Sequence, residues 1–118
     1  MGASFKDLVV WQRAVELSVE IHRLTATFPA SERFGLIDQL RRASVSIASN
    51  IAEGYGRPTR GEYVQFLGIA RASNCELQTQ LIISARLGFG TKNLYESVDR
   101  VSADVSRLLI AIMSKLKK

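Results

Sequence analysis

Four stretches of this sequence repeat apolar residues at alternating steps of four and three, and three short breaks separate them. Because an α-helix makes one turn in about 3.6 residues, this spacing places the apolar side chains along one side of a helix. No stretch of useful length alternates with the two-residue period of a β-strand. The predicted helices cover 5–28, 31–55, 59–88 and the stretch from residue 91 onward.

The breaks between the predicted helices carry residues that end helices. Pro29 follows the first helix, the run from Gly54 to Pro58 follows the second, and a pair of glycines follows the third. Thr59 with Glu62 has the spacing of a capping box, which predicts the start of the third helix. Short connections place consecutive helices antiparallel. The sequence therefore predicts an all-α fold, an antiparallel up-down-up-down four-helix bundle, in a single domain that spans residues 1–118.

The first and fourth predicted helices have more apolar residues than a monomeric bundle needs. A helix that is apolar on all sides is buried on all sides. A single chain of 118 residues is too small to surround two of its own helices completely. We therefore expect a homo-oligomer. The residues concerned are Val9, Val10, Trp11, Val15, Leu17 and Val19 in the first helix, and Leu108, Leu109, Ile110, Ile112 and Met113 in the fourth.

Basic residues exceed acidic ones, and most of them are arginine. The formal net charge is +5, and 11 of the 16 basic residues are arginines. Arginine forms bidentate hydrogen bonds with phosphate or carboxylate groups, so these side chains fit either nucleic-acid binding or ion pairs with the 11 acidic residues. The candidates for nucleic-acid binding are Arg13, Arg23, Arg41, Arg42, Arg57, Arg60 and Arg71.

Polar residues on the second helix have the spacing to share one face. These residues are Arg42, Ser46, Asn50 and Glu53, and Glu76 on the third helix has a position from which it can meet them. Buried polar groups need hydrogen-bond partners, so we predict a network between the two helices. We prefer a structural role for this network, which would fix the register of the helices, over a ligand or nucleic-acid site.

No set of residues in the sequence predicts catalysis, a metal site or a bound cofactor. His22 is the only histidine, and no local set of a nucleophile and an orienting acid accompanies it. A di-iron site in a helical bundle needs two histidines, each within a Glu-x-x-His motif, and residue 19 is a valine. We therefore expect a protein without enzymatic activity and without a cofactor.

The single cysteine and the absence of long apolar runs predict the compartment. Cys75 cannot form an intramolecular disulfide bond, and its place near the apolar stripe predicts a buried structural thiol. The amino-terminal residues lack the apolar core of a signal peptide, and no run approaches the roughly 20 apolar residues that span a bilayer. We expect a cytoplasmic protein with no membrane partner.

Several motifs in the first three predicted helices resemble one protein family. The motifs lie at 8–14, 39–43, 46–54 and 76–81, and the most specific are Gln-Leu-Arg-Arg-Ala at 39–43 and Ser-Asn-Ile-Ala-Glu-Gly at 49–54. The chain resembles the four-helix-bundle family named for proteins encoded in intervening sequences of 23S ribosomal RNA genes. That family also includes the accessory variability protein of diversity-generating retroelements.

The resemblance implies a ring-like homopentamer, and one relative acts with a reverse transcriptase and its RNA. Together with the net charge, it leads us to expect a non-enzymatic oligomeric binding or scaffold protein whose partner is nucleic acid, RNA more than DNA. A protein partner such as a reverse transcriptase is a further expectation taken from relatives. The alternative is a structural or protein-interaction module with no role in nucleic-acid binding.

Overall fold

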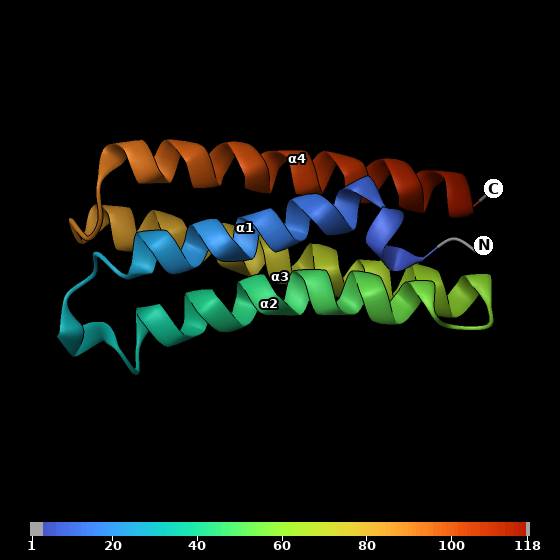
Figure 1. The fold of residues 1–118 in the computed structure, drawn as a ribbon, viewed down its shortest axis with the longest axis horizontal. Coiled ribbons are helices and arrows are strands. Elements are labelled where there is room, and N and C mark those ends of the chain that lie inside the picture. Colours follow the sequence, from blue (N-terminus) through green and yellow to red (C-terminus); the bar gives the residue numbers. More distant parts are fainter. Residues whose placement is uncertain (1–3, 118) are drawn as a thin grey trace.

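The computed structural model describes residues 4–117, which form four α-helices and two short 3-10 helices (Figure 1). The long helices run along the longest axis of a molecule that measures 44 × 22 × 21 Å. The elements in chain order are η1 (Phe5–Asp7), α1 (Val9–Thr25), η2 (Ala30–Glu32), α2 (Leu36–Tyr55), α3 (Arg60–Arg86) and α4 (Lys92–Leu116).

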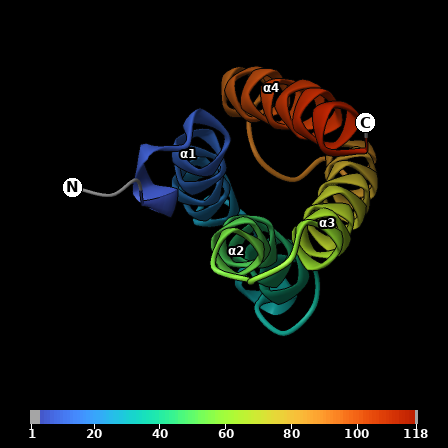
Figure 2. The same cartoon turned by 90° about the vertical axis from the view of Figure 1, so that its right-hand side faces the viewer.

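The predicted antiparallel four-helix bundle is confirmed. Successive helices run in opposite directions, and the view along the bundle shows them arranged in chain order around the core (Figure 2). Each helix packs against its two neighbours in this order, with α1 and α4 closing the bundle. The α2–α3 connection and the carboxyl end of α4 therefore lie at the same end of the molecule (Figure 1).

The core is built from the predicted apolar stripes. All four helices contribute side chains that are almost completely removed from water, which is the main favourable contribution to folding. The larger fully buried side chains are leucines and isoleucines from all four helices, and the fully buried valines come mostly from α4. The largest buried members are Leu17, Ile21, Leu24, Leu40, Ile47, Ile51, Leu67, Leu77 and Leu109.

The first two predicted helices are shorter in the structure than the sequence indicated. Leu8 has an extended backbone (φ −74°, ψ 125°), which separates η1 from α1. The hydroxyl of Ser4 and the carboxylate of Asp7 cap η1 in a reciprocal capping box, which stabilises this separate turn. Gly35 has non-helical dihedral angles (φ −108°, ψ −115°), and α2 therefore begins at Leu36 instead of residue 31.

Helices α2 and α3 approach each other closely at Gly54. A Cβ atom on this residue would lie 2.6 Å from the Cβ of Phe66 and 3.2 Å from Cδ1 of Tyr63. Gly54 is thus a buried packing residue inside α2, and Gly56 is the residue that caps the helix. The predicted cap of α3 is present, since the Thr59 hydroxyl accepts a hydrogen bond from the Glu62 amide.

The α3–α4 connection requires glycine at two positions. Gly88 and Gly90 have φ values of +83° and +79°, which side-chain-bearing residues rarely adopt. A Cβ atom on Gly90 would also lie about 3 Å from Leu24, Phe28 and Tyr95. The Tyr95 hydroxyl donates a 2.8 Å hydrogen bond to the Phe89 carbonyl, which holds this connection against the core.

Candidate nucleic-acid interface

The seven arginines predicted to bind nucleic acid are spread over three helices and one connection. Arg13 and Arg23 lie on α1, Arg41 and Arg42 on α2, Arg57 in the α2–α3 connection, and Arg60 and Arg71 on α3. Four of them form ion pairs with carboxylates, namely Arg13, Arg23, Arg42 and Arg57. Arg71 is exposed and has no ion pair within residues 4–117.

Arg13 connects α1 to α4. Its guanidinium donates hydrogen bonds to Glu16 on its own helix and to Asp104 on α4, and Asp104 also accepts from Arg107. The hydrogen bond from Arg13, followed by that from Arg107, lowers the pKa of the Asp104 carboxyl. The hydrogen bond to Asp104 in turn raises the pKa of Arg13. Arg13 is therefore engaged in joining two helices.

Arg41 joins α2 to α1 through a neutral partner. Its Nε donates a 2.9 Å hydrogen bond to the hydroxyl oxygen of Thr25. Thr25 is 1% exposed and donates its own hydroxyl to the Ile21 carbonyl at 2.7 Å. Arg41 is itself half-buried, so part of its hydrogen-bonding capacity serves the α1–α2 contact.

Arg57 lies where the chain turns from α2 into α3. Its guanidinium lies 4.7 Å from the centre of the Phe66 ring, and one of its nitrogens is 3.1 Å from the Glu53 carboxylate. A guanidinium over an aromatic face is held by the ring quadrupole. This arrangement fixes a positive charge at an exposed corner of the bundle.

Basic side chains outnumber acidic ones at both ends of the bundle, and the end that holds the α2–α3 connection is the candidate surface. We call residues 53–62 and 113–117 the basic end; they comprise the last turn of α2, the α2–α3 connection, the first turn of α3 and the last turn of α4 (Figure 1). The charged residues of the basic end are Glu53, Arg57, Arg60, Glu62, Lys115 and Lys117. Lys115 and Lys117 are exposed and form no ion pair within residues 4–117.

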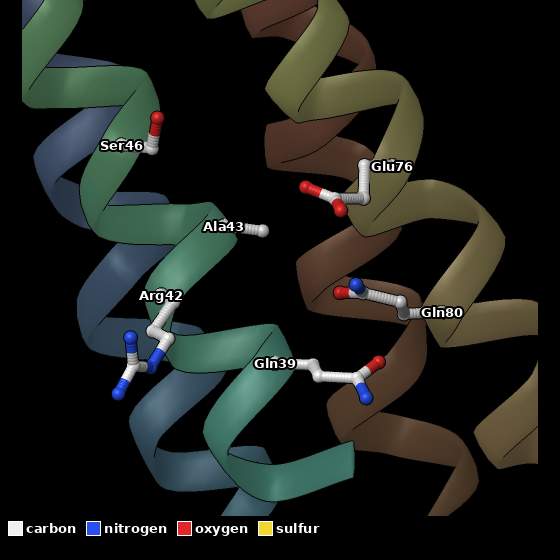
Figure 3. A pocket seen from close by; sticks show the side chains of 6 residues that line it. All are labelled: Gln39, Arg42, Ala43, Ser46, Glu76 and Gln80. Carbon is white, nitrogen blue, oxygen red and sulfur yellow. The ribbon is translucent and has the colours of Figure 1, made fainter. Parts of the chain in front are cut away.

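The predicted polar network between α2 and α3 is only partly connected. The Ser46 hydroxyl lies 3.0 Å from the hydroxyl of Ser73 on α3, and the Asn50 amide donates to the Ser46 carbonyl and hydroxyl. The other two predicted members on α2 do not pair with α3: Arg42 binds Asp38 on its own helix, and Glu53 binds Arg57 in the α2–α3 connection. Glu76 points into the space between the helices, whereas Arg42 points away from it (Figure 3).

A better connected polar network, which the sequence analysis missed, joins α3 to α4. Asn74 is completely buried, and its amide donates to the Ser102 carbonyl at 3.0 Å and to the Ser106 hydroxyl at 2.9 Å. The Ser102 hydroxyl lies 2.8 Å from the Asn74 side-chain oxygen, and the Gln78 amide lies 2.9 Å from that hydroxyl. The sequence signal for it was an asparagine within the apolar stripe of the third helix.

The prediction of a buried Cys75 is wrong, because the thiol is exposed on α3. Cys75 follows the buried Asn74 by one residue, and one step along a helix turns a side chain by about 100° toward solvent. His22 is also exposed, and its Nδ1 lies 2.8 Å from the Ser18 carbonyl. Residues 4–117 contain no group of three or more potential ligands that could hold a metal ion.

Large apolar side chains are exposed on all four helices. Val9 and Val19 on α1 and Ile110 on α4 are between 44% and 59% exposed, as expected from the wide apolar surfaces of these two helices. The other members lie on α2 and α3 or in the connections, namely Phe34, Val45, Ile69, Ile82, Ile83 and Leu87. The apolar excess is therefore not confined to α1 and α4.

Residues 6–111 match the 23S rRNA-intervening sequence protein family, and this match includes most of all four helices. The chain belongs to this family. A crystal structure of a family relative supports the same fold. It is described as a protein with unknown function from the S23 ribosomal protein family of Bacteroides thetaiotaomicron VPI-5482. The two chains superpose with a TM-score of 0.82 at 28% sequence identity, and the alignment covers 90% of this chain and 96% of the other.

No curated protein matches the chain in sequence. Among the described helices of this family member, none is long and apolar enough to cross a membrane. Two kinds of observation therefore bear on the function of this protein. One is its membership of the family of 23S rRNA-intervening sequence proteins, and the other is its own structure, with a basic end and polar contacts that join neighbouring helices.

Proposed function

We propose that this family member is a non-enzymatic, homo-oligomeric protein that binds nucleic acid, RNA in preference to DNA. The observation that carries this proposal is the basic end, where Arg57, Arg60, Lys115 and Lys117 outnumber the two carboxylates. Basic side chains near phosphates release condensed counterions, and this release drives binding that does not depend on base sequence. The family description, which refers to 23S rRNA, favours RNA as the partner.

The ion pairs of the other candidate arginines are compatible with this proposal. Exposed ion pairs contribute only about 0–1 kcal/mol, so a phosphate can replace a carboxylate at little cost. Arg42 is 80% exposed and Arg23 67% exposed, which makes both available for such an exchange. Arg13 is held by two carboxylates on two helices, and we assign it to the structure of the bundle and not to RNA.

Self-association would multiply the charge that a polyanion meets. Five copies in a ring, as the family resemblance implies, would carry a formal charge of about +25, five times the +5 of one chain. The exposed apolar side chains of Val9, Val19 and Ile110 support burial against other copies. We propose that the assembled surface, and not the single chain, is the unit that binds.

A binding role without catalysis fits the surroundings of the single histidine. The Nδ1 of His22 contacts a backbone carbonyl, and its ring is exposed on the outside of α1. General acid–base catalysis requires a titrating side chain within hydrogen-bond reach of the proton that it transfers, inside a site that holds the substrate. We propose no catalytic residue in this chain.

The test is fluorescence anisotropy with a structured RNA hairpin and a DNA hairpin of the same sequence, across a series of salt concentrations. The double variant Arg60→Gln with Lys117→Gln should weaken RNA binding and reduce the slope of log K against log salt by about 2. The matched control is Arg86→Gln with Lys92→Gln, which removes the same charge at the opposite end of the bundle. The control should keep the wild-type slope.

Two results would overturn parts of this proposal. If RNA does not bind at low salt, or binds without weakening as salt rises, the electrostatic mechanism is wrong. If the two double variants weaken binding equally, the basic end is not the binding surface. Absence of RNA binding at low salt would favour the alternative of a protein-interaction module, which the four ion-paired arginines support.

A further inference from the structure

A pocket of about 290 Å³ lies between α2 and α3, away from the basic end. Its lining residues are Gln39, Arg42, Ala43, Ser46, Glu76 and Gln80. Figure 3 shows the side chains of Gln39, Glu76 and Gln80 reaching into the space between the helices. Small Ala43 leaves this space open on the α2 side, because its methyl group extends only a short way toward α3.

Gln80 gives the pocket a buried hydrogen-bond acceptor that the described residues do not satisfy. The residue is only 8% exposed, yet its Oε1 accepts no hydrogen bond within residues 4–117. A buried polar atom without a partner is unfavourable, and native proteins almost always supply one. Since the Gln80 side chain points into the pocket (Figure 3), a donor that occupies the pocket can supply its partner.

The charges that line the pocket favour a cation. The Glu76 carboxylate points into the pocket (Figure 3), and no ion pair to it is found in the described part of the chain. Arg42 does not neutralise it, because its Nε donates to both carboxylate oxygens of Asp38 and its side chain points away. The Ser46 hydroxyl is already engaged with Ser73 and Asn50.

Glu76 and Gln80 are four residues apart, so they lie one above the other on the same side of α3. A group that satisfies both must donate several hydrogen bonds in different directions while carrying positive charge. Guanidinium does this, because its planar fork has five N–H donors and pairs bidentately with a carboxylate. An ammonium group is a compact point charge and spans two such acceptors less well.

We propose that the α2–α3 pocket binds a guanidinium group through Glu76 and the side-chain oxygen of Gln80. This group can be carried by a free small molecule or by an arginine side chain of a second copy of the chain. Arg71 and Arg100 are exposed arginines that form no ion pair within residues 4–117, so the chain itself can supply the ligand. The proposal does not depend on nucleic-acid binding.

The first arm of the test titrates the full chain with L-arginine amide and follows the backbone and side-chain amides by two-dimensional NMR. L-citrulline amide is the matched probe, because it has nearly the same shape without the charge. Arginine amide should shift the signals of Gln39, Ser46, Glu76 and Gln80, and citrulline amide should not. Glu76→Gln should weaken binding about three- to fivefold, whereas Glu96→Gln, an exposed glutamate on α4, should not change it.

The second arm distinguishes the two sources of the guanidinium group. Sedimentation velocity measures the mass of wild type, Glu76→Gln and Glu96→Gln over a range of concentrations. If a second copy supplies the group, Glu76→Gln and added arginine amide should both lower the mass, and Glu96→Gln should not. If a free molecule supplies it, arginine amide should bind without a change of mass.

Three results would overturn the proposal. The first is equal binding of citrulline amide, which would show that charge is not recognised. The second is a shift of the same signals by inorganic phosphate, which would make the pocket an anion site. The third is that arginine amide does not bind and that the mass does not depend on Glu76.

A further variant tests the second contact. Gln80→Leu, which keeps the volume of the side chain, should weaken the binding of arginine amide in the NMR titration without unfolding the chain.

Discussion

The side chains of Asn74 and Ser102 hydrogen-bond to each other at the centre of the α3–α4 interface, where both residues are almost fully buried. Asn74 also donates to the carbonyl of Ser102. Each group thus satisfies the other in a place that water does not reach, and loss of one partner leaves the other buried without a hydrogen bond.

Asn74→Ala should lower the free energy of unfolding by about 1–3 kcal/mol, because it leaves the Ser102 hydroxyl and carbonyl without their partner. Urea unfolding followed by circular dichroism measures this loss. Asn93→Ala is the matched control, since Asn93 is exposed at the start of α4. Equal stability of the two variants would show that the buried network does not stabilise the bundle.

Alanine substitutions at two glycines should change stability in opposite directions. Gly54→Ala places a methyl group against Phe66 and should cost about 1–3 kcal/mol through overpacking. Gly61→Ala, in the first turn of α3, meets nothing within 4 Å and should stabilise the helix by about 0.5–1 kcal/mol. Urea midpoints measure both effects. A neutral Gly54→Ala would mean that α2 and α3 separate without cost.

Protonation of the Asp104 carboxylate should lower the free energy of unfolding at acidic pH. Hydrogen bonds from Arg13 and Arg107 lower its pKa in the folded chain, whereas in the unfolded chain a pKa of about 3.9 applies. A lowered pKa contributes stability that is present above the unfolded value and is lost as pH falls through the folded value. Urea midpoints of wild type and Asp104→Asn should therefore differ at pH about 6 and converge as the pH falls below the ordinary aspartate pKa of about 3.9.

The control for this acid titration is Asp38→Asn, which removes an ion pair within one helix. At pH about 6 this variant should change the urea midpoint less than Asp104→Asn does, because no hydrogen bond to another helix is lost. A constant difference between wild type and Asp104→Asn across the whole pH range would contradict the assignment of the effect to the Asp104 charge.

The Cys75 thiol should react with a disulfide reagent in the folded protein, because it is exposed on α3. One thiol per chain should react without denaturant, at a rate that urea raises only slightly. Absorbance of the released thiolate measures this rate. Reaction only after unfolding would mean that the thiol is covered in solution, as contact with a second copy of the chain would do.

The helices could be predicted from the sequence because burial repeats with the period of the helix. Leu17, Ile21, Leu40 and Ile47 have the predicted spacing and are completely buried. The early end of α1 and the late start of α2 could not be predicted from this pattern. Helix α1 ends at Thr25, before Pro29, and α2 begins only after Gly35. The apolar repeat nevertheless continues through the connection, because Phe28 packs into the core as a loop residue.

The candidate site was harder to predict because it depends on how the helices meet. The pairs Arg42–Asp38 and Arg57–Glu53 are four residues apart and could have been found from their spacing. The contact of Arg13 with Asp104 joins residues 91 positions apart, and no local pattern indicates it. The same holds for the pocket, because Ala43 on α2 and Gln80 on α3 line it together although they are far apart in the sequence.

The antiparallel order of four helices brings the start of α1 and the carboxyl end of α4 to the same end of the bundle as the α2–α3 connection (Figure 1). Any affinity tag, fluorescent protein or surface linker attached at either terminus would therefore emerge beside the basic end and could block access of RNA to it. Immobilised chains would present the opposite end to solution. A dye on Cys75, which lies in the middle of α3, would leave both ends open and report on binding without this bias.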